Sequence, residues 1–341
     1  MVQNRNPAVD IAKYLAALLV VVIHTALFSD YNDTLNFVVV HIICRTAVPF
    51  FAVCTGYFLG GRLSFGDRLE KTRDNLNVFV HRWKKVFILY FVWSCLYLVF
   101  SIPSWIQTGW FSPWAFVDYA VGAITNGSHY QLWYLLFLLY SLPFVYVFLR
   151  LFSTKHQWLP ILLCWIIAIF AYTYNSFIPV NILPSAELMD TFSHIPTLTS
   201  LILVGVGISQ ERKRRHRAYY AIGFVISFGL LFAEAFALRH FGIKNVSYII
   251  FTLPTAYFLF HMILECESRL NAKITKFAAL LGSISTFVYC IHPMFIETIG
   301  QKINNSILSC ATVILLSTAT GYIFCMIKIK IREKKDNPCF S

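Results

Sequence analysis

The stretch DIAKYLAALLVVVIHTALF, residues 10–28, decides the class of fold. Its middle, from Leu15 to Ile23, is an unbroken aliphatic run, with Asp10 and Lys13 before it and His24 after it. About 20 apolar residues are enough to cross the hydrocarbon layer of a bilayer as a helix. The stretch therefore predicts a membrane-spanning helix that carries ionisable side chains near both of its ends.

The whole chain has the composition of a membrane protein. Of its 341 residues, 58% are hydrophobic and 13% are charged. A soluble domain carries about 25% charged residues, so this chain has too few polar side chains to cover a surface that faces water. The composition predicts a polytopic membrane protein. We find no repeat with a period of about 20–50 residues and expect a single domain over residues 1–341.

Apolar runs long enough to cross a bilayer occur at ten places. Lipid cannot satisfy free backbone N–H and C=O groups, and these runs are continuous rather than alternating, so they predict helices and not barrel strands. The expected fold is an all-α bundle of about ten transmembrane helices, at residues 10–28, 37–61, 86–102, 131–152, 157–175, 193–210, 217–238, 246–265, 277–299 and 306–327.

Lys and Arg residues outside these runs predict the orientation, because cytoplasmic loops are enriched in them. With the N-terminus in the cytoplasm, 23 of the 28 lie on the cytoplasmic side and 3 outside. Both termini are thus predicted to be cytoplasmic, together with residues 62–85 and 211–217, whereas 103–130 and 176–192 lie outside. The net charge of +12 follows from this topology and does not indicate nucleic-acid binding. The basic run 211–217 is predicted to bind lipid headgroups.

The nine cysteines show no Cys-x-x-Cys pair, and most of them lie inside apolar runs. A free cysteine in such surroundings behaves as a small hydrophobic residue. We therefore expect core cysteines, with no disulfide framework and no metal site.

The predicted outer segment 103–130 has no Lys or Arg but contains Trp105, Trp110 and Trp114. Tryptophan favours the headgroup region of a membrane, so an interfacial belt is one interpretation of the segment. Stacking against a sugar near a substrate entrance is the other.

Ionisable side chains inside membrane spans are costly and commonly mark functional sites. Lys13 and His24 are 11 residues apart, about 20° from a whole number of turns, so they share one helix face about 16 Å apart. Lys13 lies near the cytoplasmic end, where its side chain reaches water, and His24 lies in the outer half. A lone histidine in a span is also commonly a simple helix–helix hydrogen bond, and this alternative stays open.

Other spans place ionisable residues at the same two depths. Arg82 and Lys85 lie at the cytoplasmic rim of the third run, whereas Arg45 and His292 lie in the outer halves of theirs. A long anionic ligand entering from the cytoplasm would meet cations first and a histidine last, and acyl-coenzyme A has this form. A neutral imidazole suits the general base that deprotonates an acceptor hydroxyl. Taken alone, Arg82 and Lys85 are equally ordinary rim residues.

At these residues the sequence resembles the integral-membrane acyltransferases called acyltransferase family 3. The opening motif of that family is Asp-x-x-Arg, ten residues and then His, and Asp10, Lys13 and His24 stand at these positions, with Lys for the usual Arg. HRWKKVFILY, residues 81–90, resembles the family's Arg-x-x-Arg. CRTAVPFFAVCTGYFLGG, residues 44–61, is similar to a segment that supplies Arg45, Val48, Pro49, Phe50, Phe51, Gly56 and Tyr57.

Two further elements extend the resemblance over nearly the whole chain. QLWYLLFLLY, residues 131–140, matches a His-Leu-Trp segment, with Gln131 in place of the His and His129 two residues early. VYCIHP, residues 288–293, resembles a late element at His292.

The resemblance implies transfer of an acyl group, usually acetyl from acetyl-CoA, to a hydroxyl of an extracytoplasmic polysaccharide or lipid-linked sugar. It implies a multi-pass protein of the bacterial inner membrane, with acyl-CoA as a substrate, membrane lipid around it and no bound cofactor. Monomer and homo-oligomer both stay open. The implied catalytic residues are His24, Arg45 and His292. The implied donor-binding residues are Asp10, Lys13, Arg82 and Lys85, and the implied acceptor-binding residues are Tyr57, Gln131 and Trp133.

Two rival functions stay open. The first is a small-molecule transporter or flippase, because related membrane domains occur in proteins regarded as amino-acid permeases. Transporters often show internal repeats and paired broken helices, and neither is clear in this sequence, which favours the enzyme. The second is an assembly partner without chemistry, which the ionisable residues inside the spans argue against.

Overall fold

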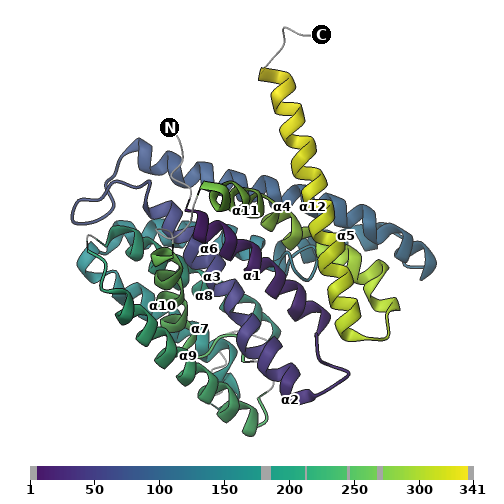
Figure 1. The fold of residues 1–341 in the computed structure, drawn as a ribbon, viewed down its shortest axis with the longest axis horizontal. Coiled ribbons are helices and arrows are strands. Elements are labelled where there is room, and N and C mark those ends of the chain that lie inside the picture. The colour runs from purple at the N-terminus through teal and green to yellow at the C-terminus, as the bar shows by residue number, and fades with distance from the viewer. Residues whose placement is uncertain (1–5, 178–185, 212, 244–245, 267–271, 337–341) are drawn as a thin grey trace. The chain divides into compact units, whose positions relative to one another are not determined.

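The computed structural model describes residues 6–177, 186–211, 213–243, 246–266 and 272–336, and its regular elements in these ranges are helices, as the sequence predicts (Figure 1). Arg5, Arg212, Lys244, Cys339 and parts of the predicted segments 176–192 and 266–276 lie outside them. The α-helices are α1 Pro7–Thr25, α2 Asp33–Asn36, α3 Ala47–Gly60, α4 Arg73–Gln107, α5 Pro113–Thr125, α6 Trp133–Leu151, α7 Trp158–Tyr172, α8 Ala186–Gln210, α9 Arg217–His240, α10 Thr252–Glu265, α11 Ala272–Thr298 and α12 Ser306–Asp336.

Nine helices within the described ranges are long and apolar enough to cross a membrane. The tenth predicted span, 246–265, contains α10, which has only 14 residues. Contacts of residues in the predicted span 246–265 show the direction in which this segment runs along α9. Phe251 N donates to Glu234 near the end of α9, and Tyr257 OH donates to Glu211 just before α9 begins, both over 3.0 Å. The short α10 therefore returns the chain to the end at which α9 starts.

The chain divides into two compact units, which we call the terminal unit, residues 1–47 with 261–341, and the middle unit, residues 48–260. In the terminal unit α1 packs along α11, and both contact α12. Tyr14 OH and Thr318 Oγ1 lie 3.0 Å apart across the contact between α1 and α12. The first and last helices of the chain's described part thus pack against each other.

Asp30 holds the loop after α1 against the start of α12. Its carboxylate accepts hydrogen bonds from Ser306 N over 2.6 Å and from Ser29 Oγ over 2.9 Å. These bonds, the one from Ser306 N first, lower the pKa of Asp30 below its ordinary 3.8. Because the folded-state pKa is depressed, the link is present at neutral pH and is lost only as the pH falls through that lowered value.

The second predicted span is irregular, but not where the sequence suggests. We expect interruptions at Pro49 and Gly56, yet α3 continues through both. The irregular part comes earlier, as a π-helix at Phe37–Ile43 followed by a 3-10 turn at Cys44–Thr46. Pro49 is tolerated because it lies in the first turn of α3, where a missing N–H costs little.

Gly56 serves a close helix crossing in the middle unit. A Cβ at Gly56 would lie 2.0 Å from Ile202 O of α8, and one at Gly205 would lie 2.0 Å from Val53 O of α3. Small residues let membrane helices approach with their backbones in contact, where packing replaces the hydrophobic effect as the source of stability. The glycine of this motif is therefore explained by packing alone.

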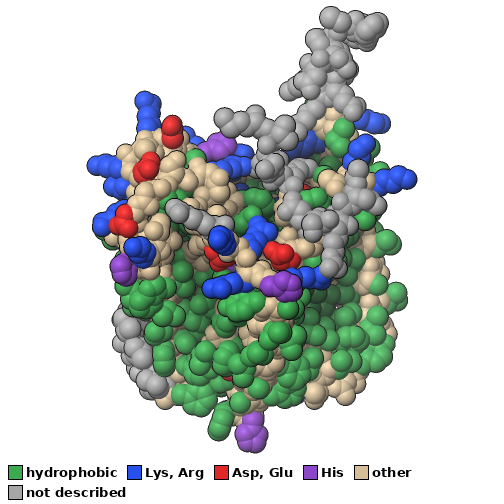
Figure 2. Space-filling model, turned by 60° about the vertical axis from the view of Figure 1, so that its left-hand side comes forward, with side chains coloured by type: hydrophobic (Ala, Val, Ile, Leu, Met, Phe, Trp, Pro, Cys, Tyr) green, Lys and Arg blue, Asp and Glu red, His purple; other side chains and the backbone are tan. Residues whose placement is uncertain are grey.

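In the middle unit, the third span and the predicted outer segment 103–130 differ from the sequence-based expectations. The third span, predicted at 86–102, belongs to a 35-residue helix that starts at Arg73, because Thr72 caps it by accepting from Asn75 N. The predicted outer segment 103–130 is largely helical, as the end of α4 and as α5. On the face drawn in Figure 2, exposed hydrophobic side chains lie side by side over a broad area, as expected for a surface in contact with lipid.

Candidate functional site

His24 and His292 meet inside the terminal unit. Their rings, from the last turn of α1 and the middle of α11, have centroids 5.3 Å apart and planes 25° from parallel. His292 is fully buried, and its Nδ1 lies 3.3 Å from Val288 O. Donation from Nδ1 to this carbonyl leaves Nε2 as the acceptor nitrogen of the neutral ring. The structure thus joins the two histidines predicted at one depth, 268 positions apart in the chain.

Arg45 follows the π-helix and sits in the 3-10 turn, which packs against α1. The neighbouring Cys44 belongs to a buried cluster with Val22, Val40 and Cys310. Arg45 Nε is buried and has no hydrogen-bond partner among the described residues. A buried, unsatisfied donor is costly, and π-helical turns are frequent at functional sites. This N–H is therefore suited to an anionic oxygen of a ligand.

Asp10 and Lys13 form an ion pair near the start of α1, with Lys13 Nζ 3.2 Å from Asp10 Oδ1. Asp10 is buried against Gly282 of α11, where a Cβ would come within 2.6 Å of its carboxyl group. The acidic residue of the opening motif thus fixes the position of Lys13. The ammonium group stays partly exposed, because the Lys13 side chain is 24% accessible.

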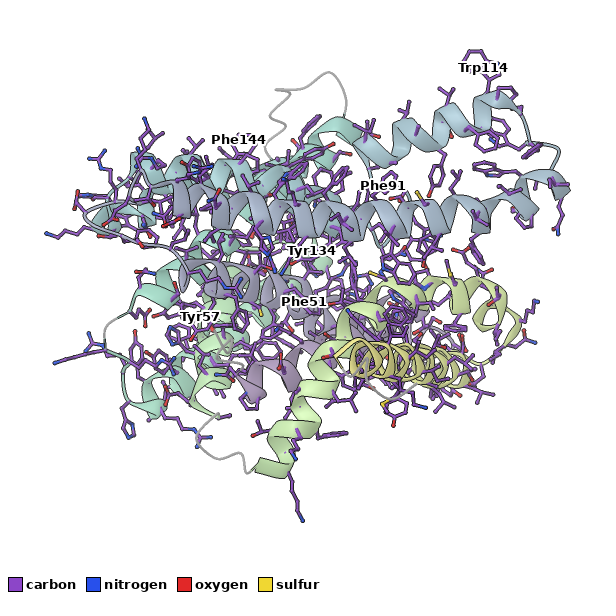
Figure 3. The ribbon with its side chains drawn as sticks, turned by 90° about the horizontal axis from the view of Figure 1, so that it is seen from above. Phe51, Tyr57, Phe91, Trp114, Tyr134 and Phe144 are labelled. Atoms are coloured by element: carbon purple, nitrogen blue, oxygen red, sulfur yellow. The ribbon has the colours of Figure 1, made fainter. Side chains whose placement is uncertain are left out.

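Arg82 lies between three helices of the middle unit. Its Nη2 donates to Thr55 Oγ1 of α3 over 3.3 Å, and the Thr55 hydroxyl also hydrogen-bonds with Tyr134 of α6. Arg82 Nε is buried and, like Arg45 Nε, has no partner within the described part of the chain. Figure 3 shows Tyr134 close to Phe51, whose ring centroid is 6.3 Å away. The guanidinium is therefore held in place, with one N–H that donates to no group among the described residues.

Lys85 differs from Arg82 although both were predicted to bind the donor. Lys85 is exposed on α4. It therefore fits the interpretation as an ordinary residue at the membrane rim better than a position lining an internal site. Thr55 and Tyr134 were not predicted from the sequence. Their only signal was that Thr55 lies within the motif segment 44–61 and Tyr134 within the segment 131–140.

Tyr57, predicted to bind the acceptor, packs its ring 5.2 Å from Phe260. Its hydroxyl lies 3.5 Å from Arg214 Nη2. Arg214 belongs to the basic run that was interpreted as a lipid-headgroup anchor. One arginine of that run thus lies against the C-terminal end of α3.

Gln131 is fully buried, and its Oε1 lies 2.5 Å from His129 Nδ1. The His129 ring stacks on Tyr97, with centroids 4.2 Å apart. Trp133 stands 4.5 Å from His194, which Phe137, Tyr172 and Tyr248 also approach. His129 and His194 are polar residues of this region that motif reasoning did not assign, because neither occupies a motif position.

The candidate residues fall in both units. The terminal unit holds Asp10, Lys13, His24, Arg45 and His292, and the middle unit holds Tyr57, Arg82, Lys85, Gln131 and Trp133. The expectation that Lys13, Arg82 and Lys85 line one cavity stays a prediction. Among the described residues, no three His, Cys, Asp or Glu side chains form a group that could hold a metal ion.

In comparisons with known proteins, the chain matches one family model and several distant relatives. A family model described as an acyltransferase domain matches residues 6–329. An amino-acid racemase of Enterococcus faecalis is 26% identical over 79% of this chain and 37% of its own length. A serine/alanine racemase of Enterococcus gallinarum is 26% identical over 98% of this chain and 48% of its own. The chain thus spans less than half the length of these relatives. No solved structure matches.

Proposed function

We propose, from the fact that this chain belongs to the membrane acyltransferase family whose domain it matches over residues 6–329, that it moves an acyl group from acyl-coenzyme A to a hydroxyl. The donor we favour is acetyl-CoA, and the acceptor is an extracytoplasmic polysaccharide or lipid-linked sugar. The protein works in the bacterial inner membrane. Family membership supports acyl transfer in general, and the donor and acceptor are our proposal.

The stacked pair of His24 and His292 carries the proposal. His24 takes the proton from the acceptor hydroxyl as its oxygen attacks the thioester carbonyl carbon. The carbon–sulfur bond then breaks, and the proton passes from His24 to the departing thiolate of coenzyme A. His292, fixed by Val288 O, orients the acceptor or shares the proton. Arg45, with its buried N–H, stabilises the oxyanion that forms on the carbonyl oxygen.

In this proposal, the acyl-coenzyme A donor is bound by cationic side chains at the cytoplasmic rim of the membrane. Lys13, positioned by Asp10, and Arg82, with Lys85 at the rim, bind the phosphates of the coenzyme. Lysine gives a point contact where arginine would give a bidentate one, so Arg82 contributes the most directional contact. Tyr57, Gln131 and Trp133 lie on the acceptor side in this proposal, with Gln131 acting through His129.

The proposal is tested in liposomes that contain the purified protein and a lipid-linked sugar extract. Radiolabelled acetyl-CoA is added, and label in the extracted acceptor is measured. We expect transfer by the native protein and by His240→Ala, an exposed histidine at the end of α9, but not by His24→Ala. Equal labelling with native protein and with His24→Ala would contradict the proposal.

A second candidate function is movement of a small amino acid across the membrane. The observation in its favour is that the curated relatives are named for racemisation of amino acids, among them serine and alanine. The same liposomes distinguish the two. Uptake of labelled serine or alanine with no acyl transfer to any acceptor would favour this candidate over the enzyme.

A further inference from the structure

α4 is longer than one membrane crossing requires. Its 35 residues extend about 52 Å, whereas the hydrocarbon core of a bilayer is about 30 Å thick. The helix is therefore tilted or projects from the membrane. Its partners along its length show which neighbours share its path.

Two helices lie end to end along α4. The first half of α4 pairs with α6, since Trp83 Nε1 donates to Leu139 O over 3.2 Å and Phe79 lies 5.0 Å from Tyr146. The second half pairs with α5. There Trp105 lies 5.4 Å from Phe116. α5 and α6 thus run antiparallel to one long helix, one after the other.

Hydrogen bonds fix α5 to α4 at two further levels. Tyr119 OH donates to Ser94 O over 2.6 Å, and Tyr90 OH donates to Ala123 O over 2.5 Å. Tyr90 is halfway along α4, so α5 reaches from the tip of the hairpin back to the middle of its partner.

The other face of α5 is uncovered and, apart from the exposed Asp118 one turn after Trp114, apolar. Trp114, Val117, Val121 and Ile124 follow a helical spacing and are 75%, 50%, 53% and 65% exposed. Trp114 points away from the helix in Figure 3. Residues 86–149 contain no Lys or Arg, and Asp118 is their single acidic residue, one turn from the start of α5. An apolar face of this size is stable in lipid and not in water.

The loop between α5 and α6 is polar and partly buried: Ser128, Gln131 and Leu132 are buried, whereas Asn126 and Tyr130 are exposed. Ser128 N donates to Tyr90 OH over 3.0 Å, and the hydroxyls of Ser128 and Ser94 are 2.7 Å apart. Gly127 has φ +101° and lies so close to Trp133 that a Cβ would come within 2.8 Å of its N. Irregular backbone is tolerated at membrane depth only where protein buries it or water lines it. The buried residues of the loop, Ser128, Gln131 and Leu132, meet that condition.

We propose that α5 and α6 form one broken membrane crossing, with the apolar face of α5 covered by acyl chains of the outer leaflet. The break at residues 126–132 then lies within the bilayer, and it brings His129, Gln131 and Trp133 below the outer surface. The inference replaces the expected outer loop by a membrane-inserted helix. Broken crossings form substrate sites in transporters, so the missing broken helix no longer favours the enzyme over a transporter. The inference concerns only the placement of α5 and is compatible with both candidate functions.

Cysteine labelling in intact cells tests the inference. We expect Trp110→Cys to react with a membrane-impermeant maleimide, and Val121→Cys and Ile124→Cys to react only after the membrane is dissolved. The native chain, whose exposed Cys95 is the background, is the control. Labelling of Ile124→Cys as fast as Trp110→Cys would place α5 in water and overturn the inference.

A spin label attached to Ile124→Cys in liposomes shows whether lipid or another protein covers the apolar face of α5. Dissolved oxygen concentrates in acyl chains, so we expect the label to collide more often with oxygen than with a water-soluble nickel complex. Low collision rates with both reagents would show a covering protein and would also overturn the inference. Because both measurements are made on inserted protein, a variant that fails to fold is detected by its absence from the membrane and replaced by Val117→Cys.

Discussion

Arg82 is a half-buried cation whose guanidinium is held by a neighbouring helix. Thr55 accepts a hydrogen bond from it and is itself hydrogen-bonded to Tyr134, yet Arg82 Nε has no partner in the described part of the chain. An unsatisfied buried donor costs about 1–3 kcal/mol, so a site that carries one is expected to gain from an anionic ligand. The second-span motif did not predict Thr55, because a hydroxyl that supports a cation has no sequence pattern of its own.

The Arg82 interpretation predicts that Thr55→Val weakens coenzyme A binding by about 10-fold, since hydrogen bonds to charged groups contribute about 1.5–3 kcal/mol. Thr55→Ser keeps the hydroxyl and should restore the affinity. Calorimetric titration of the purified protein with coenzyme A measures both. Thr108→Val, exposed at the end of α4, is the control. If Thr55→Val bound coenzyme A with unchanged affinity, Thr55 would not support Arg82 in donor binding. If the native protein did not bind coenzyme A at all, the proposed donor would be wrong.

The histidine pair predicts unequal losses of turnover. General-base catalysis contributes about 10²–10⁴-fold, so His24→Ala should lose at least about 100-fold in kcat with little change in KM for the donor. His292→Ala should lose less, and the double variant should lose little more than His24→Ala because the two act together. Initial rates of acyl transfer at saturating donor measure all three. Losses that multiply would show that the two rings act independently.

At the scale of helices, α3 and α8 depend on glycine at their crossing. Gly56→Ala and Gly205→Ala should each destabilise the protein by about 1–3 kcal/mol, because a Cβ at either position meets backbone atoms that cannot move aside. Gly207→Ala, on the same helix with open space around it, should be neutral or stabilising. Thermal unfolding in detergent compares the variants. Equal midpoints for Gly205→Ala and Gly207→Ala would contradict the close crossing.

The apolar runs predicted the helices better than their ends. Hydropathy located the first span, because its aliphatic core is uninterrupted. It missed the first 13 residues of α4, since Arg73 to Lys85 form a polar helical extension stabilised by the Thr72 cap. It also missed α5 as a helix, because its 13 residues are too few for a span and the helix packs against half of α4.

The sequence predicts those site residues that share a local motif, but not the contacts that depend on how distant helices pack. The opening motif gave Asp10, Lys13 and His24, and the structure pairs the first two. The meeting of His24 with His292 depends on how α1 packs on α11, which no local spacing encodes. The contact of Gln131 with His129 likewise required the fold of the loop before α6.

For the whole chain, the prediction is that both termini are cytoplasmic. It requires α10 to cross the membrane despite its 14 residues. Phe251, just before α10, bonds to Glu234 of α9, and Phe258 of α10 lies 5.9 Å from Tyr219 in the first turn of α9, so α10 runs back along α9 toward its start. A green fluorescent protein fused to the C-terminus should fluoresce, and alkaline phosphatase at the same place should be inactive. Phosphatase fused after Gly242 should be active and serves as the control. Active phosphatase at the C-terminus would mean an odd number of crossings.

The central claim is that the protein acylates an extracytoplasmic sugar and that His24 is its base. The most direct test is mass spectrometry of surface glycans and lipid-linked sugars from cells that carry the native gene, the His24→Ala gene or neither. We predict an acyl ester, in mass an acetyl group, that appears only with the native gene while both proteins reach the membrane in equal amounts. The same ester at equal abundance with His24→Ala, or none in any cell, would contradict the account.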